Sequence, residues 1–160
     1  MNNHRVKRFG VPLMLGVFTC LLLVSVGPVG GQEDPQPSRD PVVFKAQLLE
    51  FTQVSRRLMR EIQALPVDDS IPVDPVVHHH ARQVYILIRA ADWGMGLAIQ
   101  RQTYQDPLLS LAYKRVEGAL NLARFPLDYA GVPRSEYIGR SVQNLTRAIQ
   151  LVNQALAILP

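Results

Sequence analysis

Residues 74–103 read DPVVHHHARQVYILIRAADWGMGLAIQRQT and form the longest amphipathic run in the chain. Apolar side chains recur in this run at steps of three and four, the spacing that places them on one face of an α-helix. Asp74 can accept the free N–H groups of a first helical turn, and Pro75 has a helical φ angle and no N–H to leave unpaired. The run therefore predicts a helix over 75–103. Its expected buried face consists of Val77, Ala81, Val84, Ile88, Ala91, Met95 and Ala98.

The same signals recur on both sides of this run. Asp-Pro pairs at 40–41 and 106–107 mark two further helix starts. A fourth start is marked by Pro133 with Glu136, because a carboxylate in the first turn suits the helix dipole. Residues that precede a proline leave the helical region of backbone space, which places the helix ends. The additional helices are expected over 41–65, 107–124 and 133–159.

Four helices with one apolar face each and short connections are typical of a bundle. We expect an all-α, antiparallel up-and-down four-helix bundle over residues 41–160. No strand-like alternation of apolar and polar residues competes with this interpretation.

Residues 1–31 have the pattern of an export signal, with a basic prefix at 5–8, an apolar run at 9–26 and small residues after it. Removal of this segment would take away three basic residues and no acidic one, so the net charge of +4 would fall to about +1. It would also remove Cys20, the single cysteine. The sequence therefore predicts a secreted or periplasmic protein without disulfides.

Residues 32–40 hold several prolines and acids and no large apolar side chain, which indicates a Pro-rich linker before the bundle. If the signal stays uncleaved, residues 9–26 could anchor the chain, since their length is near the lower limit for a membrane span. We expect no other membrane contact.

Two helices carry apolar residues opposite their expected buried faces, which an isolated bundle does not need. Trp and Arg are residues that anchor interfaces, so we interpret these positions as a docking surface for a protein partner or a second copy of the chain. The alternative is that the Pro-rich segment or the loop 125–132 covers them. The predicted partner-binding residues are Arg82, Ile86, Arg89, Ala90, Trp93 and Leu97 on the second helix, and Leu151 and Ile158 on the fourth.

Three adjacent histidines, His78, His79 and His80, raise the possibility of a metal site. Adjacent helical side chains point about 100° apart, so the three cannot chelate one ion by themselves. Met95 or His80 could serve as an axial ligand if a haem lay against the backbone at Gly94 and Gly96. The other explanation for these glycines is a kink or a close helix crossing. We expect no cofactor, and a metal- or haem-binding periplasmic bundle is the alternative function.

Catalytic groupings are not visible in the sequence: no glycine-framed serine, no HExxH motif and no paired-carboxylate spacing occurs. Tyr85 and Asp92 could share a structural hydrogen bond.

Arginines on the first helix alternate with acids, which favours a solvated face over nucleic-acid binding. The sequence therefore predicts a non-enzymatic interaction or scaffold subunit of the cell envelope or periplasm.

Overall fold

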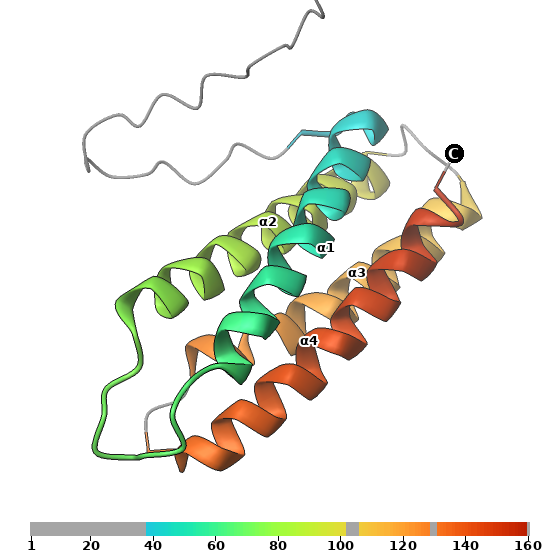
Figure 1. Cartoon of the computed structure of the whole chain (residues 1–160). Helices are drawn as coiled ribbons and strands as arrows, with labels where there is room; N and C mark the ends of the chain where they lie inside the picture. The colour runs from blue at the N-terminus through green and yellow to red at the C-terminus, as the bar shows by residue number, and fades with distance from the viewer. Residues whose placement is uncertain (1–37, 102–105, 129–130, 160) are drawn as a thin grey trace, which may run out of the picture. The chain divides into compact units, whose positions relative to one another are not determined.

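Four α-helices follow one another in the computed structural model, which describes residues 38–101, 106–128 and 131–159 (Figure 1). The all-α prediction is confirmed for this part of the chain, in which no β-strand occurs. The predicted signal peptide and residues 32–37 of the predicted linker lie outside the described residues. The elements are α1 (Pro41–Gln63), α2 (Pro75–Gln100), α3 (Pro107–Ala123), the short 3-10 helix η1 (Phe125–Leu127) and α4 (Arg134–Leu156).

Three of the four helices begin as the sequence predicts. In α1, α2 and α3 the aspartate before the first proline accepts a hydrogen bond from the N–H two residues later, at 2.9, 2.8 and 2.8 Å. These bonds satisfy part of the first helical turn. The helices end one to three residues earlier than expected, at Gln63, Gln100, Ala123 and Leu156.

Helix α4 begins at Arg134, one residue later than predicted, and its N-cap residue Pro133 offers no side-chain cap. The cap comes from a distant loop, because the Arg134 N–H donates to Asp69 Oδ1 at 2.5 Å. The Arg134 guanidinium also donates to the carbonyl oxygen of Ile71 at 2.5 Å. The loop between α1 and α2 is thereby fixed to the start of α4.

Each helix packs against the next one, and α4 packs against α1. The diagonal pairs, α1 with α3 and α2 with α4, share no close contact within the described residues. Consecutive helices run in opposite directions, as Figure 1 shows. The described residues therefore form a four-helix bundle with helices adjacent in chain order.

The bundle core contains the apolar face predicted for α2, together with the buried faces of α1, α3 and α4. On α4 the helical spacing of apolar residues predicts Ile138, Val142 and Leu156 in the core, but these three side chains are only half-buried. The buried face of α4 instead contains Tyr137 and Ser141, together with Leu145, Ala148, Ile149, Val152 and Ala155. Tyr137 fits there because its hydroxyl donates to the carbonyl oxygen of Pro126 at 3.2 Å. The buried face of α4 is thus shifted around the helix, toward Tyr137 and Ser141, relative to the face that apolar spacing alone predicts.

Gly94 marks a close approach between α2 and the chain that leads into α1. A β-carbon at Gly94 would meet the carbonyl oxygen of Ser38 and would lie 2.9 Å from Phe44 Cε1. At Gly96 the same atom would lie 3.5 Å from the Tyr113 ring, an ordinary van der Waals separation. The close-crossing explanation therefore holds for Gly94, whereas Gly96 has no steric need to be glycine.

Candidate interaction site on the outer face of α2

Trp93 is the largest exposed apolar residue on α2. It is 53% exposed, although large aromatic side chains usually bury most of their area. Arg82 and Arg89 are also exposed, and Ile86 and Leu97 are half-buried. These five residues form the α2 outer face, and the structure brings them together as the helical spacing predicts.

Ala90, which was assigned to the same surface, is in fact only 4% exposed. It lies one helical turn before Gly94, on the flank of α2 that Phe44 and Ser38 approach. Its small side chain is covered there, so Ala90 does not contribute to the α2 outer face.

The two residues predicted on α4 also differ from the expectation of an outward patch. Leu151 and Ile158 are half-buried and pack against the core. The Leu151 Cδ1 atom would lie 3.2 Å from a β-carbon at Gly118 of α3. The buried face of α4 is shifted around the helix relative to the predicted one, as described above. Leu151 and Ile158 therefore lie at the edge of that face.

Beside the α2 outer face lies a hollow of about 370 Å³ between α2 and α3. Three aromatic side chains line it, two from α2 and Tyr113 from α3. We call it the aromatic hollow, and it is lined by Tyr85, Arg89, Asp92, Trp93, Gly96, Leu97, Gln100, Tyr113 and Leu120. Its volume is at the lower end of the range of about 300–1,000 Å³ typical of small-ligand sites.

Asp92 is the acidic group of the aromatic hollow, and its Oδ1 atom is shielded from solvent without a hydrogen-bond partner. The bond to Tyr85 that the sequence suggested is not among the hydrogen bonds of the described residues. Burial raises the pKa of the Asp92 carboxyl, and the nearby charge of Glu117 on α3 raises it further. The carboxyl group therefore lacks both a donor and a positive counter-charge.

Tyr113 lies in the same electrostatic environment. Burial raises the pKa of its phenol, and the charges of Asp92 and Glu117 add to this effect. The two acids are thus close enough to Tyr113 to disfavour any further negative charge there. The aromatic hollow is negative at its α2–α3 junction and apolar along its aromatic walls, and Arg89 adds one positive charge to its lining.

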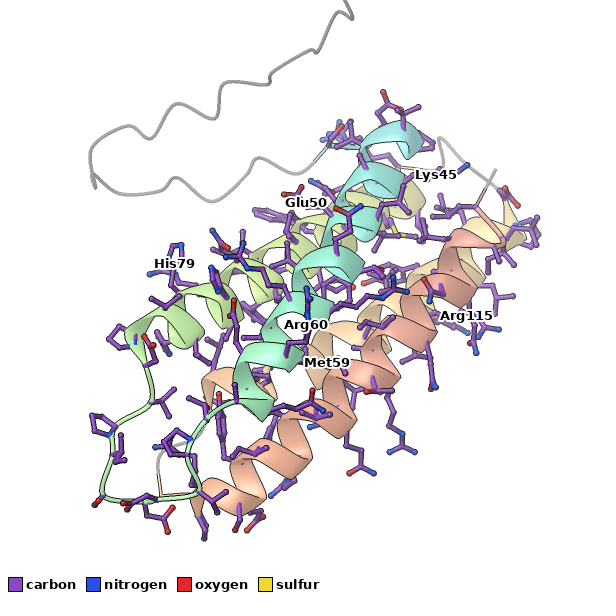
Figure 2. All side chains as sticks on the ribbon, in the orientation of Figure 1. Lys45, Glu50, Met59, Arg60, His79 and Arg115 are labelled. Atoms are coloured by element: carbon purple, nitrogen blue, oxygen red, sulfur yellow. The ribbon has the colours of Figure 1, made fainter. Side chains whose placement is uncertain are left out.

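The histidines at the start of α2 are engaged in separate contacts. His80 Nδ1 lies 2.6 Å from Glu61 Oε2 of α1, and His79 Nε2 lies 3.1 Å from Gln83 Nε2. His79 points away from the bundle in Figure 2, and His78 is exposed. Among the described residues no group of three His, Cys, Asp or Glu side chains is arranged to hold a metal ion.

Met95 is fully buried in the bundle core. It is fifteen residues from His80 on the same helix, which corresponds to about 22 Å at the helical rise. The two residues considered as alternative axial ligands therefore belong to different regions of α2.

A second hollow, of about 530 Å³, lies where the loop between α1 and α2 meets the start of α4. Arg134 lines it and is only 6% exposed. Its backbone N–H and its guanidinium already hold Asp69 and Ile71. We therefore assign Arg134 to the connection between this loop and α4.

The chain matches no family model, no curated protein and no solved structure. Within the described residues, no helix combines the length and apolarity needed to cross a membrane.

Proposed function

We propose that the protein is an exported, non-enzymatic interaction or scaffold subunit of the cell envelope or periplasm. It binds a protein partner, or a second copy of itself, through the α2 outer face. The observation that carries this proposal is the 53% exposure of Trp93 on a helix that already has a complete buried face on its other side.

The composition of the α2 outer face supports this role. Trp and Arg are enriched among the residues that dominate binding energy at protein interfaces. Trp93 has exposed Arg89 one helical turn before it, and half-buried Leu97 one turn after it. A partner that covers Trp93 would remove a large apolar surface from water, which is the main favourable term in association.

The proposal of export rests on residues 1–31, whose basic prefix, apolar run and small residues match a signal peptide. The alternative is a metal- or haem-binding bundle. The positions of its candidate ligands in the structure do not favour it. Met95 lies in the core, and His80 contacts Glu61.

The experiment is a comparison of two matched variants, Trp93→Asp and Leu49→Asp. Leu49 lies on α1 and is also 53% exposed. Each variant is produced in the native host, and the size of its assembly is measured by native electrophoresis and light scattering. We expect Trp93→Asp to dissociate the assembly and Leu49→Asp to preserve it, with both variants folded by circular dichroism. A strictly monomeric wild-type protein would contradict the proposal.

A further inference from the structure

We propose that the aromatic hollow receives one basic side chain, a lysine or an arginine, from the protein partner. This inference rests on the proposed function, because it specifies what the partner inserts beside the α2 outer face. The argument comes from the walls of the hollow, the two acidic side chains in and near it, and its size.

The walls of the aromatic hollow suit a cation. Tyr85 and Trp93 from α2 and Tyr113 from α3 all line the same space. Aromatic rings attract ammonium and guanidinium groups through their negative faces. Three such rings around one hollow favour a cation with an apolar stem, as lysine and arginine have.

The carboxylate that lines the hollow and the one close to it are complementary to the same ligand. Asp92 Oδ1 has no hydrogen-bond partner, and Asp92 is not in any ion pair of the described residues. Glu117 adds a second negative charge close to Asp92 and Tyr113. An ammonium or guanidinium group in the hollow would place a positive charge beside both carboxylates.

Arg89 also lines the hollow, three residues before Asp92 on α2. A side chain there could compete for the Asp92 carboxylate, but no ion pair between them is formed in the structure. The positive charge of Arg89 would oppose an incoming cation. Removal of this charge should therefore strengthen cation binding, whereas removal of a carboxylate should weaken it.

The size of the hollow limits the ligand. A space of about 370 Å³ suits a single long side chain, whereas a helix or an extended peptide would have to rest on the surrounding α2 outer face. The basic side chain is thus one anchor within a larger contact, and Trp93 borders both.

The test uses the full chain and Trp93 as the reporter, since it is the single tryptophan. The probes are the N-acetyl methylamides of lysine and arginine, with that of norleucine as the neutral control of similar length. Binding is followed by Trp93 fluorescence and by the NMR shift of its indole N–H. We expect a saturable response to lysine or arginine at millimolar concentration, and none to norleucine.

Four variants locate the response. Asp92→Asn should weaken binding about tenfold, because it removes the charge that pairs with the cation. Glu117→Gln, at an exposed position, should weaken it about twofold to threefold, as expected for a solvent-screened charge. Arg89→Gln should strengthen it by a similar factor. Glu50→Gln, an exposed carboxylate on α1 (Figure 2), is the matched control and should leave binding unchanged.

Three outcomes would overturn the inference. The first is an equal response to norleucine, and the second is a lysine or arginine response that Asp92→Asn and Glu117→Gln both leave intact. The third is at least tenfold tighter binding of tetramethylammonium, which would assign the hollow to a free small cation. If Trp93→Asp still dissociates the assembly while no basic probe binds, this inference fails and the proposed function stands.

Discussion

The carbonyl oxygen of Ser38 lies against Gly94, at the place that a β-carbon would occupy. The chain leading into α1 therefore crosses α2 at a point where only glycine leaves room. This contact fixes the entry of the described chain into the bundle one residue away from Trp93. Gly96 has no such contact, so we expect an alanine substitution to change the protein's stability in opposite directions at Gly94 and Gly96.

Gly94→Ala should destabilise the protein by about 1–3 kcal/mol, the usual cost of forcing an atom into a packed site. Gly96→Ala should instead stabilise it by about 0.5–1 kcal/mol, because alanine is the better helix former and the added carbon finds an ordinary contact. Urea denaturation of both variants measures the difference. Equal effects would show that Ser38 does not lie against Gly94 in solution.

Asp92 should make the protein less stable as the pH rises. Its pKa is raised in the folded state, so the folded protein holds the Asp92 proton more tightly than the unfolded chain does. By linkage, the free energy of unfolding falls as pH rises from the unfolded pKa through the raised folded pKa, and stays lower above it.

Asp92→Asn should abolish this part of the pH dependence and increase stability at neutral pH relative to wild type. The measurement is chemical denaturation at several pH values between about 3 and 7, the range in which raised carboxyl pKa values titrate. Glu50→Gln serves as the exposed control. Parallel curves for wild type and Asp92→Asn would contradict the prediction.

Glu61 connects α1 to α2 through His80, with 2.6 Å between Oε2 and Nδ1. It also pairs with exposed Arg57 on its own helix at 3.1 Å. Glu61→Ala should cost about 1–2 kcal/mol, because it leaves the mostly buried His80 without its partner. Arg57→Ala should cost at most about 0.5 kcal/mol, as for exposed helix ion pairs. Thermal unfolding measures the stability of both variants. Similar losses of stability would show that the contact between Glu61 and His80 contributes no more than the exposed ion pair.

Asp69 caps α4 from a loop more than sixty residues earlier in the chain. Asp69→Ala should cost about 0.5–2 kcal/mol, the range for loss of an N-cap. Hydrogen exchange would show the loss in the first turn of α4 and in the loop that holds Ile71. Unchanged protection there would contradict the assigned role of Asp69.

Much of the fold could be predicted because its signals are local. Asp40, Asp74 and Asp106 each bond within their own helix start, so the Asp-Pro pairs are sufficient to locate α1, α2 and α3. The start of α4 depends on Asp69 and could not be predicted from neighbouring residues. The buried face of α4 includes Tyr137, whose hydroxyl donates to the carbonyl oxygen of Pro126, and apolar spacing does not contain that information.

The candidate site was predictable in part for the same reason. Helical spacing places Arg82, Arg89 and Trp93 on one outer face without reference to other helices. The aromatic hollow also requires Tyr113, which meets α2 near Gly96 only after α3 has packed. Leu151 was expected on the outer surface of α4, but it is half-buried and approaches Gly118 of α3. Its exposure depends on how α4 packs against α3, which helical spacing does not determine.

A photo-cross-linking side chain, p-benzoylphenylalanine, placed at position 93 or at position 49 in the native host would test the role of the α2 outer face. We predict that position 93 forms a defined adduct with one partner protein or with a second copy of the chain, and that position 49 forms none. Equal labelling from the two positions, or no adduct from position 93, would contradict the proposal that the protein acts by binding a partner through Trp93.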